Sequence, residues 1–152
     1  MPSLESLTSP DLVFPDLLAT DALAVLRELA EMVAGTGLVP EPETLFQRLW
    51  EREQLGSTAI GNGVAIPHCK LNGLQRVLVA VGLSRNGVDF GAADGKSVRL
   101  FFLVASPSRS PAEHLQSLAA ISKWVKGAGH VERLLDLRDG PAIVAAIRGE
   151  GG

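Results

Sequence analysis

His68 lies at the end of a segment with few large side chains, "STAIGNGVAIPH". Gly61 and Gly63 permit backbone conformations and close approaches that other residues forbid. Pro67 fixes its own φ and favours extended backbone in the residue before it, so the chain leading to the histidine is restrained. These features predict an imidazole that a bulky partner can reach. The alternative is a histidine at a strand end that is hydrogen-bonded and chemically inert.

Hydrogen-bond donors lie close upstream of this histidine. Ser57 and Thr58, with the N–H groups of the glycine-rich backbone, are of the kind that hold phosphoryl oxygens. Two common phosphate-binding motifs are not fulfilled. "GAADGKS" has three residues between its glycines and precedes a predicted strand, whereas the nucleotide-binding loop needs four and a following helix. "GNGVAI" has Ile66 where the dinucleotide-binding fingerprint has its third glycine.

Cys69 follows the histidine directly, which suggests a Cys–His dyad as an alternative. Neighbouring residues on an extended chain point to opposite faces, so we do not expect this dyad. The chain has one cysteine, which excludes an internal disulfide framework and a cysteine-rich zinc module. The paired His/Cys spacing of a metal site is also missing from the sequence. We therefore expect neither a metal nor a cofactor.

The composition excludes several classes of function. The chain has 152 residues, a net charge of −3 and no basic run, which argues against nucleic-acid binding. Hydrophobic residues make up 46% of it, as is typical of a globular protein with its own core. No uncharged apolar segment approaches the ~20 residues of a membrane span, and no signal peptide is apparent. We expect a cytoplasmic protein without direct membrane insertion.

Four segments have helical patterns. Residues 20–37 and 42–56 carry apolar residues at a spacing of three or four and end at glycines, and Pro42 suits a first turn. "HVERLLDL" and "GPAIVAAIRG" indicate two shorter helices. A fifth helix has the clearest start, in "SPAEHLQSL". There Ser110 is expected to cap, Pro111 to take the first helical position, and Glu113 to complete a capping box.

Strand-like segments lie between these helices. "RVLVAVGLS" and "VRLFFLVAS" are rich in β-branched and apolar residues, and the second indicates a central strand covered on both faces. Asp94-Gly95 between them predicts a hairpin turn, and residues 11–20, broken by Pro15, predict an edge strand. This order predicts an α/β fold with a mixed β-sheet flanked by helices on both faces. We expect a single domain over residues 1–152, with an ordered core of about 5–148.

Residues 52–68, "REQLGSTAIGNGVAIPH", closely resemble a family signature. The signature belongs to the enzyme IIA domains of the fructose/mannitol class (type 2) in the bacterial phosphoenolpyruvate-dependent phosphotransferase system. Its pattern is Arg-Glu, a few residues, then Ser-Thr-Gly-Ile-Gly-x-Gly-Val-Ala-Ile-Pro-His. The likeness continues through "VDFGAADGKSV" and "HLQSLAAISK" and covers essentially the whole chain. Ala59 departs from it, because the family usually has glycine there.

The resemblance implies a function for three side chains. It implies that His68 accepts a phosphoryl group from the phosphocarrier HPr and hands it on. It assigns Arg52 to charge stabilisation of the phosphoryl oxygens and His114 to hydrogen-bond support. Without the resemblance neither would stand out, because "WEREQ" is typical of a solvated helix face and a histidine in a first helical turn often has no role. The family fold, a mixed sheet flanked by helices, agrees with the pattern above.

The resemblance leaves two branches open. A nitrogen-regulatory protein signals by its phosphorylation state to a regulated target protein, whereas a sugar-specific component passes the phosphoryl group to a IIB domain during sugar uptake. "PHCKL" resembles the "PHGKL" frequent in the nitrogen branch, and no segment resembles IIB, IIC or HPr. We therefore favour the regulatory type, with the fructose/mannitol-like carrier as the alternative. A third hypothesis is an interaction module that is not phosphorylated.

Overall fold

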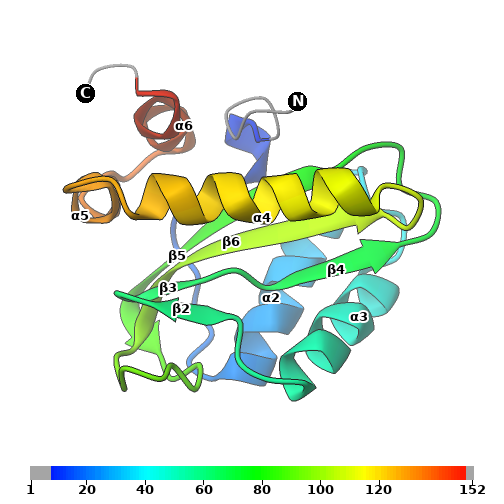
Figure 1. Ribbon diagram of the computed structural model, residues 1–152, viewed down its shortest axis with the longest axis horizontal. Helices are drawn as coiled ribbons and strands as arrows, with labels where there is room; N and C mark the ends of the chain where they lie inside the picture. The colour runs from blue at the N-terminus through cyan, green and yellow to red at the C-terminus, as the bar shows by residue number, and fades with distance from the viewer. Residues whose placement is uncertain (1–7, 150–152) are drawn as a thin grey trace.

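The computed structural model describes residues 8–149, in which one mixed sheet lies between two layers of helices (Figure 1). The elements, in chain order, are a 3-10 helix η1 (Pro10–Leu12), β1 (Val13–Phe14), α2 (Ala22–Gly35), α3 (Pro42–Gln54), β2 (Ala59–Gly61), β3 (Val64–Ala65), β4 (His68–Leu71), β5 (Leu78–Val88), β6 (Val98–Pro107), α4 (Pro111–Val125), α5 (His130–Leu135) and α6 (Gly140–Arg148). The predicted helices and the two long strands are thus confirmed. Residues 5–7 of the expected ordered core lie outside the described residues.

Strand β6 organises the sheet. The strand order is β1-β5-β6-β3-β2, and β4 also pairs with β6. β5 and β6 are antiparallel, whereas β3 and β4 run parallel to successive stretches of β6, with Val64 opposite Leu100 and His68 opposite Val104. Pro67 lies in the break between β3 and β4, where its carbonyl accepts a hydrogen bond from Val104 N. The sheet is mixed, as predicted, and β4 lies at its edge.

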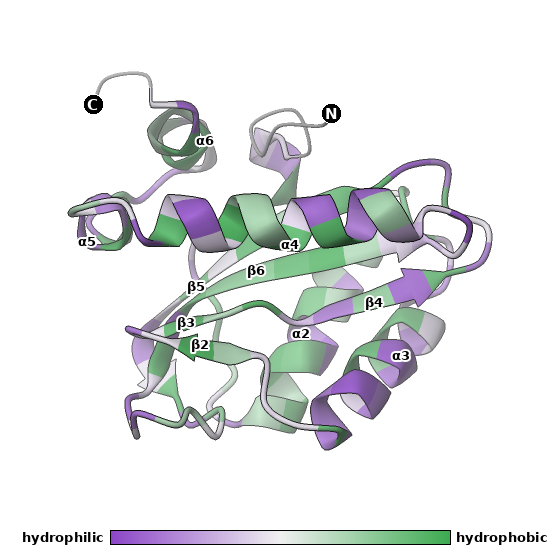
Figure 2. Ribbon diagram, in the orientation of Figure 1, coloured by the Kyte–Doolittle hydropathy of each residue, from purple (hydrophilic) through white to green (hydrophobic). Residues whose placement is uncertain are grey.

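Consecutive residues of β6 face different hydrophobic clusters. Phe101 lies in the cluster that contains the buried residues of α2 and α3. Phe102 lies in the cluster that contains Ile121 of α4 and the buried residues of α5 and α6. Figure 2 shows β5 and β6 as mostly hydrophobic along their length. This confirms a central strand covered on both faces, because a strand with one solvated face would alternate with polar residues.

The helix starts follow the sequence, with one exception. Asp21 caps α2 by accepting a hydrogen bond from Ala24 N at 2.8 Å. α4 begins at Pro111 after Ser110, as predicted, but the Ser110 side chain makes no capping hydrogen bond. The capping box with Glu113 is therefore wrong. The N-cap usually has extended backbone, and Ser110 departs from it with a ψ of 55°.

A turn forms here, but its central residues are Ala93 and Asp94 rather than the predicted Asp94-Gly95, and it lies in a broader connection than a two-residue hairpin. Residues 89–97 join β5 to β6. Gly95 has a φ of 74° and donates through N to Ala92 O. The Asp94 carboxylate accepts from Lys96 N and from Asn62 N at 3.0 Å. This loop is thereby tied to the turn between β2 and β3, just upstream of His68. Among the helices of residues 8–149, none has the length and apolar character needed to cross a bilayer.

Candidate functional site

Three elements meet at the edge of the sheet where β4 begins. His68 is the first residue of β4, Arg52 lies in the last turn of α3, and His114 lies in the first turn of α4. The structure brings all three expected residues together. They line an open hollow of about 600 Å³.

The hydrogen bonds of His68 define which ring nitrogen is free. Nδ1 lies 2.7 Å from the carbonyl oxygen of Ile66, which can only accept, so Nδ1 carries the proton. Nε2 therefore has the lone pair, and it accepts a hydrogen bond from Arg52 Nε at 3.3 Å. Arg52 is itself anchored, because its Nη1 donates to Gly56 O at 2.9 Å. Nε2 is the nitrogen able to act as a nucleophile.

The surroundings keep the His68 ring neutral. Burial lowers the pKa of His68 below its ordinary value of 6.5, and the nearby Arg52 charge lowers it further, against the hydrogen bond to Ile66. A neutral ring keeps the Nε2 lone pair available near pH 7. The ring is half-buried, so it remains accessible from the hollow.

His114 is buried and held by a serine. Ser106, which is fully buried in β6, has its Oγ 2.7 Å from His114 Nδ1. A serine hydroxyl can donate or accept, and donation to Nδ1 leaves the imidazole proton on Nε2. Burial lowers the pKa of His114 to about 4, and the neighbouring His68, when it is protonated, and Lys70 add to this effect. With ring centroids of His68 and His114 5.4 Å apart, His114 can serve as a neutral donor beside His68.

The structure places Ser57 and Thr58 beside the site, but in contacts with the protein. Both border a smaller hollow of about 240 Å³ that also contains Arg52 and His68. The Ser57 hydroxyl donates to the carbonyl oxygen of Phe90. Thr58 donates through both Oγ1 and N to the Glu53 carboxylate, at 2.8 Å each. Their expected role in phosphoryl binding stays a prediction.

Cys69 borders the same hollow as His68, but it is buried. It is buried in the cluster under α2 and α3, on the opposite face of β4 from the His68 ring, as the strand geometry predicts. Burial raises the pKa of its thiol to about 12. A thiol that stays protonated at pH 7 is a poor nucleophile. This arrangement disfavours the Cys–His dyad.

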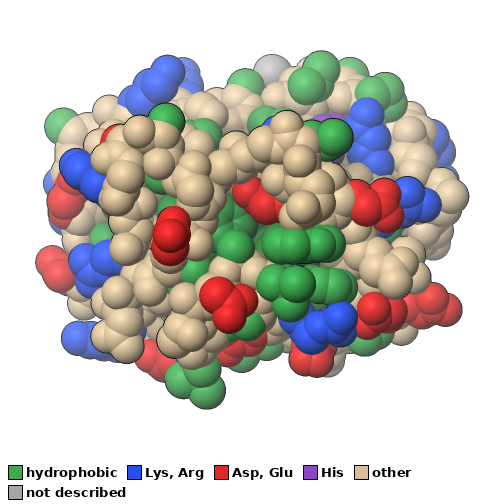
Figure 3. All heavy atoms as spheres, turned by 90° about the horizontal axis from the view of Figure 1, so that it is seen from below, with side chains coloured by type: hydrophobic (Ala, Val, Ile, Leu, Met, Phe, Trp, Pro, Cys, Tyr) green, Lys and Arg blue, Asp and Glu red, His purple; other side chains and the backbone are tan. Residues whose placement is uncertain are grey.

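Sequence reasoning missed four residues around the site. Leu55 and Leu115 border the hollow with side chains 84% and 66% exposed, and the sequence does not show that these leucines face solvent. Figure 3 shows a histidine at the surface beside hydrophobic and basic side chains. Ser106 carried no signal in the sequence. Glu53 did carry one, because it stands next to Arg52 within the matched signature.

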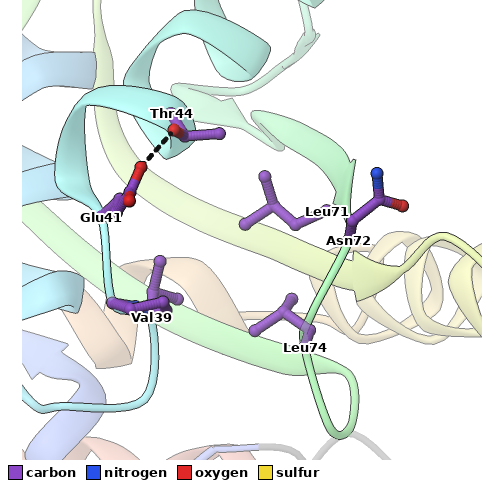
Figure 4. A pocket seen from close by; sticks show the side chains of 7 residues that line it. Val39, Glu41, Thr44, Leu71, Asn72 and Leu74 are labelled. Carbon is purple, nitrogen blue, oxygen red and sulfur yellow. Dashed lines mark hydrogen bonds between the residues drawn. The ribbon is translucent and has the colours of Figure 1, made fainter.

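A separate pocket of about 270 Å³ lies beyond the other end of β4 (Figure 4). Val39, Leu71 and Leu74 form its apolar part, and Glu41 and Thr44 form a hydrogen-bonded pair at its rim. It contains none of the expected site residues. Its position leaves the hollow at His68 as the candidate site.

Comparisons with known proteins point to one family. The family described as "Phosphoenolpyruvate-dependent sugar phosphotransferase system, EIIA 2" matches residues 6–149. A nitrogen regulatory protein of Bradyrhizobium diazoefficiens is 34% identical over 145 residues, covering 95% of this chain and 94% of that protein. A fructose-specific EIIA component of Haloferax volcanii is 32% identical over 108 residues, covering 71% of this chain and 70% of that protein.

A solved structure extends the similarity to the fold. The nitrogen regulatory protein IIA-Ntr of Neisseria meningitidis superposes with a TM-score of 0.87 at 26% identity, covering 95% of this chain and 98% of that one. The family match over residues 6–149 includes Arg52, His68 and His114. The chain therefore belongs to the type-2 enzyme IIA family of the phosphoenolpyruvate-dependent sugar phosphotransferase system.

Proposed function

We propose that this protein is a phosphohistidine carrier that accepts a phosphoryl group on Nε2 of His68 from an HPr-type phosphocarrier. The observation that carries the proposal is the state of that nitrogen. Nε2 carries no proton, because the ring proton is on Nδ1 and is donated to Ile66 O. The Arg52 guanidinium donates a hydrogen bond to the Nε2 lone pair. A neutral nucleophile and a cation thus meet at one point of an open hollow.

The transfer follows from this geometry. Nε2 attacks the phosphorus, the new N–P bond forms, and the bond from phosphorus to the donor atom breaks with its electron pair leaving on the donor. Enzymatic phosphoryl transfer depends mainly on positioning and on stabilising the charge of the oxygens. Arg52 turns its donor from Nε2 to these oxygens, and the Nε2–H of His114 donates to them. Ile66 O stabilises the positive charge that develops on the His68 ring.

The rim of the hollow suits a macromolecular donor. Leu55 and Leu115 present exposed apolar side chains next to the polar site, the combination typical of the centre of a protein–protein interface. We propose an HPr-type protein as the donor and a IIB domain or a regulated target protein as the next partner. We also propose a single domain over residues 1–152 that works in the cytoplasm, where the other components of this system would meet it.

The regulatory branch is favoured over the sugar-specific one. The Bradyrhizobium and Neisseria relatives are both described as nitrogen regulatory proteins and match almost the whole chain. The fructose-specific relative matches a shorter part at a similar identity. A sugar-specific component that passes the phosphoryl group to a IIB domain is therefore the second candidate.

A labelling experiment tests the carrier function. The protein is incubated with phosphoenolpyruvate and the enzyme I and HPr of its own organism, and acid-labile phosphate on the chain is measured. We expect labelling of the wild type, none of His68→Ala, and slower labelling at the same position in His114→Ala and Arg52→Ala. Full labelling of His68→Ala would defeat the assignment.

A second experiment separates the branches. His68→Glu and His68→Ala are used as baits in a lysate of the source organism, and the retained proteins are identified. The regulatory type predicts a target that distinguishes the charged from the uncharged variant. Recovery of a IIB protein as the main partner would instead establish the sugar-specific alternative.

A further inference from the structure

Glu53 has a set of contacts that the transfer scheme does not use. It follows Arg52 in the last turn of α3, and its carboxylate points into the loop after the helix. One carboxylate oxygen accepts from Thr58 N and the other from Thr58 Oγ1, both at 2.8 Å. Thr58 is only 5% exposed, so water competes little for these bonds.

The hydrogen bonds continue from Thr58 to the His68 ring. The carbonyl oxygen of Thr58 accepts from Ile66 N at 3.0 Å. The carbonyl oxygen of Ile66 accepts from His68 Nδ1 at 2.7 Å. Ile66 is 4% exposed, so the peptide groups at both ends of this residue are held inside the protein. A continuous path therefore joins the Glu53 carboxylate to the nitrogen that defines the tautomer of His68.

We propose that Glu53 is a positioning residue, which through Thr58 and the Ile66 peptide holds the His68 ring with its Nδ1 protonated and its Nε2 lone pair directed at the hollow. The part of this inference that concerns phosphoryl transfer rests on the proposed function. The effect on the ring itself can be measured without any phosphoryl donor.

The type of side chain supports this role. A carboxylate has two acceptor oxygens, so one side chain can bind both donors of Thr58. Burial raises the pKa of Glu53 above its ordinary value, against the hydrogen bonds from Thr58 and the Arg52 charge that lower it. A half-buried carboxylate carries a desolvation cost, and two short bonds to one residue of the loop are what offset it here.

Arg52 holds the same loop from its other end. Its Nη1 donates to Gly56 O at 2.9 Å while its Nε donates to His68 Nε2. Two neighbouring side chains of α3 thus fix the loop between the helix and β2, one through Gly56 and the other through Thr58. Release of Glu53 would loosen the loop to which Arg52 is anchored, as well as the peptide that holds His68 Nδ1.

The test uses the full chain and four variants. Glu53→Ala removes both acceptors, Glu53→Gln keeps one acceptor oxygen, Thr58→Val removes only the hydroxyl donor, and Thr58→Ser keeps that donor. Glu43→Gln is the control, because Glu43 is an exposed hydrogen-bonded carboxylate on the same helix. For each variant, ¹⁵N NMR of the His68 ring gives the protonated nitrogen, and single-turnover kinetics with phosphorylated HPr give the maximal rate and the half-saturating concentration.

We expect Glu53→Ala to convert the Nδ1-protonated ring into a mixture of tautomers and to slow the maximal rate by about tenfold to a hundredfold, because a small misplacement of reacting groups has effects of this size. The tautomer mixture and the maximal rate of Glu53→Gln and Thr58→Val should lie between those of Glu53→Ala and the wild type, and those of Thr58→Ser should match the wild type. The half-saturating HPr concentration should not change, since Glu53 acts on the ring and not on docking. Glu43→Gln should match the wild type.

A wild-type tautomer and rate in folded Glu53→Ala would overturn the proposal. If Glu53→Ala does not fold, a wild-type ring in both Glu53→Gln and Thr58→Val would overturn it equally. If the wild type accepts no phosphoryl group, the proposed function fails, and the ¹⁵N signals alone still decide whether Glu53 positions the ring.

Discussion

Nε of Arg52 donates a hydrogen bond to Nε2 of His68 across 3.3 Å. This places the only side-chain cation within hydrogen-bond distance of that nitrogen, among the described residues, at the point where a phosphoryl group would arrive. The contact has two effects, and both favour phosphoryl acceptance. It disfavours protonation of His68, and it offers a donor that an incoming phosphoryl oxygen can take over.

Arg52→Ala should therefore raise the pKa of His68 and slow phosphoryl acceptance. The pKa rises because a neighbouring positive charge is removed. The rate should fall by about 10²–10³-fold, the usual effect of losing one preorganised donor to a developing negative charge. NMR titration of the ring and single-turnover labelling measure the two effects. Unchanged values of both would contradict the role given to Arg52.

Ser106 should act only through His114. Ser106→Ala frees His114 Nδ1 from its 2.7 Å hydrogen bond and lets the ring take either tautomer, so acceptance should slow, though less than in His114→Ala. The double variant should be no slower than His114→Ala, because the two changes remove one common interaction. Rates of the four proteins complete the cycle, and additive losses would show that Ser106 has a separate effect.

Stability should rise with pH between about 4 and 6.5 because of His114. Its pKa is about 4 in the folded chain and has an ordinary value of 6.5, so in this window the unfolded chain binds a proton that the folded chain does not. The contribution is complete above pH 6.5 and lost as the pH falls toward 4. The stability measured by urea unfolding should depend less steeply on pH in His114→Gln, with a difference of about 3 kcal/mol across the window. Parallel profiles would exclude this origin.

Leu55→Ser and Leu115→Ser should weaken HPr binding without unfolding the protein. Both side chains are largely exposed, so the free energy of unfolding should change by less than about 0.5 kcal/mol, while each loss at the centre of an interface should weaken binding by about tenfold. Titration calorimetry measures the dissociation constants. Leu18→Ser is the matched control, because Leu18 is 83% exposed and outside the hollow. Equal weakening by all three would contradict a docking rim at His68.

Cys69 should be unreactive in the folded protein. Its pKa of about 12, compared with an ordinary value of 9.0, reduces the thiolate fraction by about a thousandfold. A disulfide reagent at pH 8 should therefore label the native chain far more slowly than the chain in urea. Cys69→Ala should accept the phosphoryl group at the wild-type rate, and loss of transfer in that variant would revive the Cys–His alternative.

The sequence predicted the layout of this protein better than its local hydrogen bonds. The nearly continuous apolar run of β6 and the glycine stops of the helices depend on local chemistry, and they placed the sheet and its two helical layers. The capping role of Ser110 was wrong, because a cap needs a backbone and side-chain geometry that the residue type alone does not determine. Ser57 and Thr58 have the right groups to bind a phosphoryl oxygen. Whether those groups are free depends on Glu53 and Phe90, and partners of this kind become known only in the fold.

The tautomer of His68 could not be predicted for the same reason. Pro67 indicated only that the backbone before the ring is restrained. The position of the proton on Nδ1 follows from the hydrogen bond to Ile66 O, and the lone pair on Nε2 is identified by the hydrogen bond from Arg52, sixteen residues upstream. The family resemblance identified the three side chains, and the structure identifies which of their atoms take part. The exposure of Leu55 and Leu115 could not be predicted either, because whether a leucine faces solvent depends on the surface around it.

The position of β4 at the sheet edge has a consequence for signalling. Arg52 reaches His68 from the helix layer on one face of the sheet, and His114 reaches it from the layer on the other. A phosphoryl dianion on Nε2 would bind groups from both layers, and would thereby hold the end of α3 and the start of α4 together for as long as it is present. A binding protein that spans both helices would then sense the phosphorylation state as a difference in stiffness as well as in charge, and slower amide hydrogen exchange at those two helix ends would reveal it.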